Sequence, residues 1–320
     1  MITTMTTPAL HASGLRKSFG DTVALDGLDL SVQEGSVFAL LGPNGAGKTT
    51  TVQILSTLIP ADAGEVRVAG HDPASDPQAV RDAIGVTGQF SAVDNLLTGE
   101  ENLALIADLH HLDRDEGRRR AGCLLEELDL MAERSRPAAT YSGGLRRRLD
   151  LAMTLIGDPR IIFLDEPTTG LDPRSRRAVW RIVRRLVDRG VTIFLTTHYL
   201  EEADQLADRV AVLDHGKLIA EGTPDELKRR APGGHVLLQF ADAAALDEAT
   251  RVVSAGKRDD DALTLQVPGD GGVDSLRELL DRLKRASIAV ERLTVHTPDL
   301  NDVFLALTGR LEEEEEGDPR

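Results

Sequence analysis

The sequence is poor in cysteine, and Cys123 is the only one among 320 residues. A single thiol excludes an internal disulfide, and such cysteine usage is typical of proteins in a reducing compartment. We therefore expect a cytosolic protein. Hydrophobic residues still make up 41% of the chain, which is enough to build the cores of one large or two ordinary domains.

Long apolar runs are also missing. Runs such as VFALL and IIFL fall far below the ~18 residues that a membrane-spanning helix needs. The N-terminal stretch MITTMTTPALHASG has no charged region followed by an apolar one, so it does not resemble a secretory signal. We expect that the chain does not cross a membrane by itself.

Positive charge is the third shortage, because 37 lysines and arginines stand against 53 aspartates and glutamates and leave a formal net charge of −16. A nucleic-acid partner would have to bind a local basic patch against the overall field of the protein. We therefore expect no nucleic-acid partner.

Short apolar runs of β type alternate with helical periods, as in SVFALLG, which precedes a helix from about Lys48. This alternation predicts an α/β fold with a parallel sheet covered by helices. We assign it to one domain over residues 8–230. Between about 95 and 158 helical periods dominate, which predicts an inserted helical lobe with Cys123 packed inside it.

The stretch APGG at residues 231–234 indicates a linker, because proline and glycine punctuate regular structure. Residues 235–310 then alternate strand and helix patterns, which predicts a small C-terminal α/β domain with a third strand at about 288–295. This domain carries no motif for nucleotide chemistry, so we expect a role in regulation or assembly. Residues 311–320 form an acidic run that we expect to be a disordered tail.

The stretch GPNGAGKT matches the phosphate-binding pattern G-x-x-x-x-G-K-[ST], with an apolar strand before it and a helix after it. In such a loop backbone N–H groups close around phosphate oxygens, and the helix N-terminus adds a positive dipole end. Lys48 would reach the β- and γ-phosphates, and Thr49 would offer a hydroxyl to Mg²⁺. The alternative is a glycine-rich turn that binds nothing. The predicted nucleotide-binding residues of this loop are Gly42, Pro43, Asn44, Gly45, Ala46, Gly47, Lys48, Thr49 and Thr50.

The stretch IIFLDEP ends a buried strand with two adjacent carboxylates, Asp165 and Glu166. Two carboxylates indicate two roles. Asp165 would hold Mg²⁺ through water, and Glu166 would polarise the attacking water as a general base. The alternative is that Asp165 only ends the strand while Glu166 is solvated.

These motifs resemble those of the nucleotide-binding subunit of an ATP-binding cassette (ABC) transporter, and the resemblance covers about residues 8–230. It implies a P-loop NTPase fold of the ABC ATPase type, with ATP and Mg²⁺ as cofactors and a helical subdomain. Three segments are similar to those of the daunorubicin-resistance type of bacterial drug-export ATPase: YSGGLRRRLDLA, TTGLDPRSRRAVW and LNDVFLALTGR.

The resemblance assigns roles to four further residues. Phe19 would stack on adenine, and Asp172 would lie in a loop that crosses a dimer interface. Gln89 would sense the γ-phosphate, join Thr49 and Asp165 around Mg²⁺ and face the membrane partner, and His198 matches the switch histidine. The residues alone leave other interpretations open. Phe19 fits a core aromatic, Gln89 a polar loop residue, Asp172 a helix N-cap and His198 a hydrogen-bonded strand end.

The stretch YSGGLRRRLD occupies the place of the family's signature motif, usually Leu-Ser-Gly-Gly-Gln. Ser142, Gly143 and Gly144 keep the hydroxyl and amides that would meet the γ-phosphate of a second subunit at a helix N-terminus. Tyr141 and Leu145 depart from the motif. We expect the three arginines that follow to lie on exposed turns of that helix.

The resemblance implies an ATPase that powers a bacterial exporter of drugs or antibiotics. The chain would form a homodimer around two ATP molecules, bind a separate membrane-spanning permease and lie at the cytoplasmic side of the membrane as a peripheral subunit. The alternatives are the ATPase of a lipid or polysaccharide exporter, that of an importer, or a soluble ABC protein acting on ribosomes or DNA.

Overall fold

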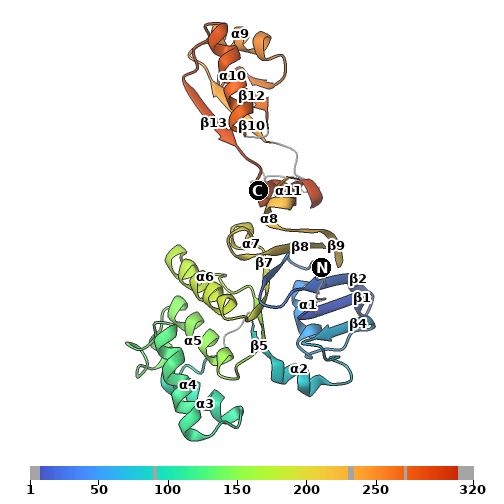
Figure 1. Cartoon of the computed structure of the whole chain (residues 1–320), viewed down its shortest axis with the longest axis vertical. Coiled ribbons are helices and arrows are strands. Elements are labelled where there is room, and N and C mark those ends of the chain that lie inside the picture. Colours follow the sequence, from blue (N-terminus) through green and yellow to red (C-terminus); the bar gives the residue numbers. More distant parts are fainter. Residues whose placement is uncertain (1–7, 89–91, 230–233, 270–271, 309–320) are drawn as a thin grey trace, which may run out of the picture. The chain divides into compact units, whose positions relative to one another are not determined.

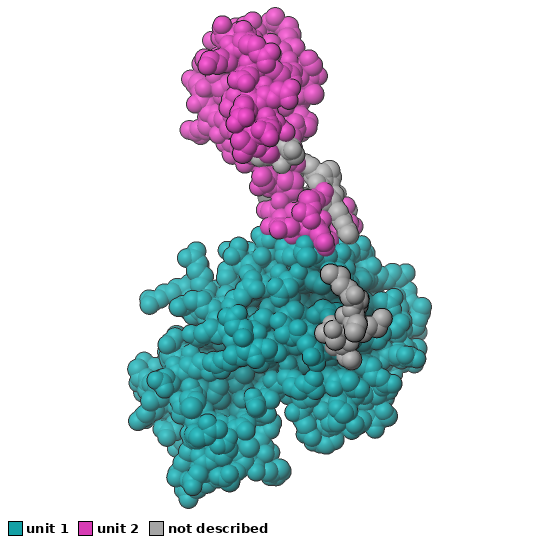
Figure 2. All heavy atoms as spheres, in the orientation of Figure 1, with its two compact units in different colours: residues 1–224 teal, residues 225–320 magenta. Residues whose placement is uncertain are grey.

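The computed structural model of the chain describes residues 8–88, 92–229, 234–269 and 272–308. The chain divides into two compact units, residues 1–224 and 225–320, which are teal and magenta in Figure 2. Within the described ranges, every helix falls short of the length and apolar character that a membrane span requires. Gln89, residues 231–233 of the predicted linker at 231–234, and the predicted tail at 311–320 lie outside the described residues.

A six-stranded sheet forms the centre of the first unit (Figure 1). All five residues of the strand VFALL are buried, as expected for the interior of a parallel sheet covered on both faces. The phenyl rings of Phe38 and Phe194 stack with centroids 5.6 Å apart across neighbouring strands. In sheet order the strands are β5 (Ile84–Thr87), β6 (Ile161–Asp165), β7 (Thr192–Thr197), β3 (Val37–Leu41), β8 (Arg209–Asp214) and β9 (Lys217–Gly222), and only β9 is antiparallel to its neighbour.

The register of this sheet brings the predicted motifs to one edge. Leu41 at the end of β3 pairs with Thr197 at the end of β7, and Asp165 at the end of β6 pairs with Thr196. Because the strands are parallel, the segments that follow their carboxyl ends leave the sheet side by side. This edge is where doubly wound α/β folds bind their ligands.

A separate three-stranded antiparallel sheet packs with the central sheet through a shared apolar core that includes Leu15, Leu28 and Phe38. Its order is β2 (Thr22–Val32), β1 (Leu10–Phe19) and β4 (Ala63–Val68). Neither these strands nor β5, β8 and β9 of the central sheet were predicted from the sequence.

The helices of the first unit include three that make up residues 95–158, where the structure has no strand, as predicted. These are α3 (Gly99–Leu109), α4 (Arg114–Glu127) and α5 (Gly143–Leu155), and the short 3₁₀ turn η1 (Ala138–Thr140) lies between α4 and α5. The prediction that Cys123 packs inside this lobe is wrong, because its side chain is exposed on α4. The other helices are α1 (Lys48–Leu55), α2 (Pro77–Ala83), α6 (Pro173–Asp188), α7 (Leu200–Leu206) and α8 (Pro224–Lys228), the last of which crosses from the first unit into the second.

The second unit has its own apolar core, formed around an antiparallel sheet by residues such as Leu238, Phe240, Leu246 and Leu283. The alternating pattern is the predicted one, with two differences. The last strand begins only at Arg292, and a short strand at Lys257–Asp259 was not predicted. In chain order the elements are β10 (His235–Gln239), α9 (Ala243–Val253), β11 (Lys257–Asp259), β12 (Thr264–Pro268), α10 (Val273–Arg285), β13 (Arg292–His296) and α11 (Leu300–Thr308).

Candidate functional site

The glycine-rich loop between β3 and α1 has a backbone that only glycine fits at two points. Gly47 has φ 109°, and a β-carbon there would lie 2.6 Å from the carbonyl oxygen of Ala24. A β-carbon on Gly42 would overlap the carbonyl oxygen of Leu213. The loop is therefore held against its surroundings, as a phosphate cradle requires.

The remaining residues of this loop divide between solvent and core. Asn44, Gly45 and Thr49 are exposed, whereas Ala46 is buried and its carbonyl oxygen accepts a hydrogen bond from the N–H of Gly216 at 3.0 Å. Pro43 and Thr50 are half-buried. Asn44 and Gly45 precede α1, and Thr49 lies in its first turn, where unpaired helical N–H groups attract anions.

Lys48 is the most constrained cation of the loop, because only 5% of its side chain is exposed. Its Nζ donates to the carbonyl oxygens of Gly42 at 2.8 Å and Pro43 at 3.1 Å and lies 4.0 Å from Oε1 of Glu166. Burial lowers the pKa of Lys48, although the nearby carboxylates of Glu166 and Asp165 favour its charged form. The ammonium group is thus fixed next to the loop that would receive phosphate.

Asp165 is buried at the end of β6 between two hydroxyl groups. Its Oδ2 accepts from Oγ1 of Thr49 at 3.3 Å, and its Oδ1 accepts a short hydrogen bond from Oγ1 of Thr196. Carboxylate and hydroxyl oxygens are the ligands that Mg²⁺ prefers, together with substrate phosphates and water. The pair of Asp165 and Thr49 therefore fits the predicted Mg²⁺ site.

Glu166 follows directly and has the left-handed backbone that non-glycine residues rarely adopt, with φ 49°. Its N–H donates to the carbonyl oxygen of Thr196 at 3.1 Å, which holds this conformation. The carboxylate lies with Oε1 3.2 Å from Nδ1 of His198, while Oε2 accepts from Oγ1 of Thr169 at 3.3 Å. The alternative of a solvated Glu166 is excluded, because only 13% of its side chain is exposed.

Two contacts of this cluster were missed from the sequence. Thr196 binds Asp165 through its hydroxyl, and Thr169 binds Glu166. A signal was present, since the polar stretch TTH begins with the last two residues of the buried strand β7, at the same sheet edge as Asp165. Thr169 lies three residues after Glu166 in a turn, a spacing that carries no signal of its own.

The stretch at residues 142–144 opens α5 as predicted. Ser142 is the N-cap residue, and its Oγ accepts from the N–H of Leu145 at 3.3 Å. Ser142 and Gly143 are exposed, so the first N–H groups of the helix face solvent. Gly144 is buried against Ser175 of α6, where a β-carbon would lie 2.7 Å from the serine Cβ.

The departure from the family motif at Tyr141 has a structural reason. Its ring is buried in the helical lobe, and the hydroxyl donates to the carbonyl oxygen of Glu133 at 2.6 Å. Burial raises the pKa of Tyr141. The other departure, Leu145, is half-buried on the first turn of α5.

The expectation that the next three arginines lie on exposed turns is wrong, because all three are half-buried. Burial lowers the pKa values of Arg147 and Arg148. Each guanidinium instead donates to backbone carbonyl oxygens: Arg146 to Ala138, Arg147 to Gly88, and Arg148 to Leu128 and Asp129.

The most buried of the three, Arg147, forms an ion pair with Asp150 one turn later on α5, with Nη1 and Oδ2 3.1 Å apart. Nη1 also donates to the carbonyl oxygen of Gly88 at 3.1 Å. Asp150 accepts from the N–H of Ala92 at 3.2 Å. The two residues that flank 89–91 are thereby both bonded to α5.

The two other predicted residues take positions that decide between the open interpretations. Phe19 is not a core aromatic, because 51% of it is exposed, and Nζ of Lys17 lies 5.5 Å from its ring centroid. Asp172 is the N-cap of α6, accepting from the N–H groups of Arg174 and Ser175 at 2.9 and 3.0 Å. The capping role of Asp172 is thus shown, and a role at an interface stays a prediction.

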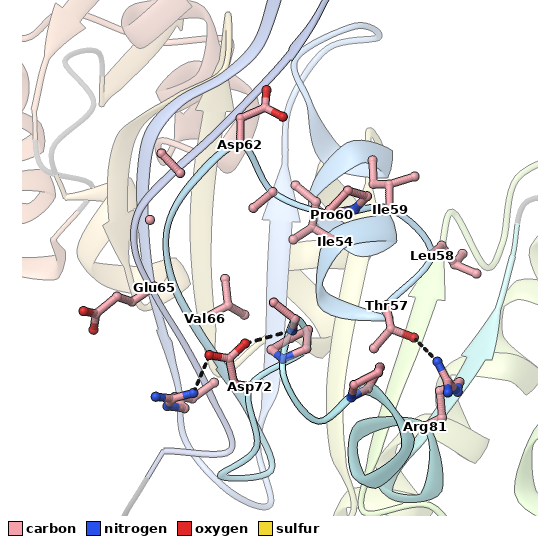
Figure 3. Close-up of a pocket in the computed structure, with 17 residues that line it drawn as sticks. Ile54, Thr57, Leu58, Ile59, Pro60, Asp62, Glu65, Val66, Asp72 and Arg81 are labelled. Carbon is pink, nitrogen blue, oxygen red and sulfur yellow. Dashed lines mark hydrogen bonds and ion pairs between the residues drawn. The ribbon is translucent and has the colours of Figure 1, made fainter.

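A hollow of about 660 Å³ lies between the end of α1, β4 and α2, away from the cluster formed by Lys48, Asp165 and Glu166 (Figure 3). Leu58, Ile59 and Pro60 form one wall, and Arg81 donates to Oγ1 of Thr57 at 3.4 Å across another. None of the predicted nucleotide-binding residues that the structure describes lines this hollow, so it is not the candidate nucleotide site.

Comparison with known proteins places these features in a family. A model of the ABC transporter family matches residues 25–169, and a model of the C-terminal domain of ATP-binding proteins like DrrA1-3 matches residues 222–308. The chain is 48% identical to the daunorubicin/doxorubicin resistance ATP-binding protein DrrA of Streptomyces peucetius, over 96% of this chain and 94% of that protein.

Two further comparisons agree. The chain is 37% identical to the Nod factor export ATP-binding protein I of Ralstonia nicotianae, over 95% of each chain. Its structure is similar to that of a solved ATP-binding subunit of an ABC transporter, with a TM-score of 0.62 and 29% identity, covering 69% of this chain and 92% of that one.

Proposed function

This chain belongs to the ABC transporter family, and from that premise we propose that it hydrolyses Mg²⁺-ATP as one of two identical subunits that power a membrane exporter of drugs. The observation that carries the proposal is the convergence of Lys48, Asp165, Glu166 and His198 at one edge of the central sheet. Asp165 ends β6 and Glu166 follows it, His198 follows β7, and Lys48 opens the helix after β3.

The proposed reaction transfers the γ-phosphoryl group of ATP to water. The N–H groups of the loop at 42–49 and the ammonium of Lys48 would bind the phosphate oxygens. Thr49, Asp165 and Gln89 would hold Mg²⁺, whose charge would offset that of the phosphate oxygens.

Glu166 would accept a proton from the attacking water, since its carboxylate is next to the phosphate loop and is held by two neighbours. The imidazole of His198, within hydrogen-bonding distance of that carboxylate, would orient it. The same imidazole would act as the switch that responds to the γ-phosphate. Phe19, exposed beside Lys17, would stack on the adenine ring.

We infer the need for a second subunit from the N-terminus of α5. Ser142 and Gly143 are exposed, and together with the buried Gly144 they open a helix whose N-terminus forms an anion site separate from the phosphate loop. We propose that this site meets the phosphates bound by another copy, with Asp172 at the interface. The C-terminal unit would serve assembly or regulation, because the predicted nucleotide-binding motifs all lie before residue 200.

The export role comes from the relatives, whose names concern daunorubicin and doxorubicin resistance and Nod factor export. A separate permease would carry the substrate through the membrane. This chain would bind that permease at the cytoplasmic face of the membrane as a peripheral subunit. An exporter of lipids or polysaccharides and an importer would use the same catalytic residues. Co-expression with candidate permeases, scored by drug efflux, separates these outcomes.

The variant Glu166→Gln tests the chemistry. It should retain ATP binding but lose turnover by ~10² or more, the scale of general-base loss. In this variant ATP should drive dimerisation, which light scattering detects. Glu65→Gln, an exposed substitution on β4, is the control and should leave turnover unchanged. Wild-type turnover in Glu166→Gln, or a monomer at saturating ATP, would contradict the proposal.

A further inference from the structure

His198 is the least confined residue of the cluster at the sheet edge. Its side chain is 34% exposed, whereas those of Lys48 and Glu166 are 5% and 13% exposed. The distance of 3.2 Å between its Nδ1 and Oε1 of Glu166 gives one polar contact. A single contact does not fix a ring that turns about two side-chain bonds. A second contact is therefore needed to hold the imidazole in one orientation.

Tyr199 supplies this second contact. The ring centroids of His198 and Tyr199 lie 4.1 Å apart, with an angle of 42° between the ring planes. The backbone of Tyr199 is fixed on both sides, because its N–H donates to Oγ1 of Thr197 at 2.9 Å and its carbonyl oxygen accepts from the N–H of Glu202 at 3.1 Å. The tyrosine ring therefore limits the rotation of the imidazole beside it.

Arg176 of α6 in turn holds the ring of Tyr199. Its Cζ lies 4.8 Å from the ring centroid, within the range of a cation–π contact. The side chain is only 21% exposed, and its Nε is buried without a hydrogen bond to any residue that the structure describes. A buried N–H group without a partner is costly, so hydrogen bonding does not explain this position. The ring contact does, since a desolvated cation is attracted more strongly to an aromatic face.

The alternative is that Arg176 serves only its ion pair with Glu201. Nη1 and Oε2 of this pair are 3.4 Å apart, and the side chain of Glu201 is 63% exposed. Ion pairs with so exposed a partner contribute little. Such a pair also gives no reason for a guanidinium group to lie over an aromatic ring.

The helix that carries Arg176 is itself fixed against the site. Its N–H donates to the carbonyl oxygen of Asp172, the N-cap of α6, at 2.9 Å. One turn after Arg176, Nε1 of Trp180 donates to Oε1 of the buried Glu202 on α7 at 3.1 Å. Arg176 therefore reaches Tyr199 from a helix whose place beside α7 is set.

We propose that Arg176 and Tyr199 are positioning residues for ATP hydrolysis, and we call the two residues the His198 support. The guanidinium group holds the tyrosine ring, and the ring holds the imidazole of His198 toward the carboxylate of Glu166. This inference rests on the proposed function, because it concerns the same imidazole and carboxylate. The support acts on the rate of hydrolysis and leaves ATP binding to the phosphate loop.

Kinetics of the full chain test the role. Arg176→Met keeps an unbranched side chain without the charge, and it should lower kcat ~10-fold, because a misplaced group can cost up to about 10²-fold. The Kd for ATP, measured by calorimetric titration, should stay unchanged. Tyr199→Leu should lose as much. The double variant should lose no more than Tyr199→Leu alone, since both residues act through one ring.

Conservative variants and controls separate the ring contact from other effects. Arg176→Lys keeps a cation and should recover part of the loss, and Tyr199→Phe keeps the ring and should retain turnover. Arg177→Met is the matched control, because Arg177 is the next residue of α6 and is exposed. Glu201→Gln removes the ion pair but leaves the cation over the ring. Both control variants should hydrolyse ATP like the wild type.

A spectrum of the nucleotide-free protein tests the contact without any turnover. Histidine rings are labelled with ¹³C, and the His198 resonance is assigned by its absence in His198→Gln. An aromatic ring at 4.1 Å shifts that resonance, so it should move in Tyr199→Leu and in Arg176→Met but not in Arg177→Met. The other histidine resonances should stay in place, which shows that each variant is folded.

The outcomes decide between the interpretations. A His198 resonance that stays in place in both support variants would overturn the contact. A shifted resonance with wild-type kcat would overturn the positioning role, and a loss in Glu201→Gln equal to that in Arg176→Met would assign the effect to the ion pair instead. A wild-type chain without turnover would refute the proposed function, and the spectrum would still test the contact.

Discussion

The contact between Gly144 on α5 and Ser175 on α6 predicts that Gly144→Ala destabilises the first unit. A β-carbon at Gly144 would lie 2.7 Å from Cβ of Ser175 and even closer to its Oγ. The serine has little freedom to move, because its Oγ donates to Oδ2 of Asp172 at 2.6 Å and its N–H donates to Oδ1 of the same residue at 3.0 Å. The added methyl group therefore forces either the helices apart or the serine off its cap.

Three contributions set the size of the effect. Overpacking typically costs about 1–3 kcal/mol. Loss of the hydrogen bond from Ser175 to Asp172 adds about 1 kcal/mol, and the better helix propensity of alanine returns up to about 1 kcal/mol. We expect a net loss of about 1–3 kcal/mol in the free energy of unfolding.

Urea unfolding followed by Trp180 emission measures this change, because Trp180 lies on α6 with Ser175. Gly143→Ala is the neighbouring control, since its β-carbon would meet only Cδ2 of Leu171 at an ordinary 3.5 Å. Ser175→Gly removes the obstructing Cβ, so the double variant should lose less than the sum of the two single losses. The packing argument fails if Gly144→Ala is as stable as the wild type, or if the two losses simply add.

Two further predictions concern buried charges. Lys48→Ala should weaken ATP binding at least tenfold, because it removes a charge-assisted bond of about 1.5–3 kcal/mol; calorimetric titration checks this, with the exposed Lys217→Ala as control, and unchanged affinity would refute it. Burial raises the pKa of Glu202 above its usual 4.5, so stability falls as pH rises from 4.5 through the folded pKa. Glu202→Gln should therefore be more stable than the wild type by about 1–3 kcal/mol at neutral pH and lose this advantage below 4.5 in pH-dependent urea unfolding; an advantage that persists there would contradict the assignment.

The sequence predicted the central parallel sheet and the helical lobe because their signals are local. A fully apolar stretch such as VFALL predicts a buried strand within a few residues, and a stretch such as GPNGAGKT predicts a phosphate-binding loop in the same way. The antiparallel sheet escaped prediction because its strands mix polar and apolar residues with bulges, as between Ala12 and Leu15. The pairing of β1 with β4 joins segments about fifty residues apart, which no local pattern reveals.

The site divides in the same way. Lys48 and Asp165 were predictable from motif spacing, whereas the hydroxyl of Thr196 reaches Asp165 only through the register of two strands. Likewise, RRR was predicted to be solvated because a run of charge usually is. The carbonyl groups that accept from Arg147 and Arg148 belong to residues 19 to 59 positions earlier in the chain, so the burial of these two arginines depends on tertiary structure.

The ion pair of Arg147 and Asp150 has a consequence for how this protein varies in evolution. Its two members bond to Gly88 and Ala92, on either side of residues 89–91, so each carries both a charge and a backbone partner. Losing one member strands a buried charge, which selection removes quickly. Arginine and aspartate at these positions should therefore be inherited as a pair, and lineages that lose one should lose the other.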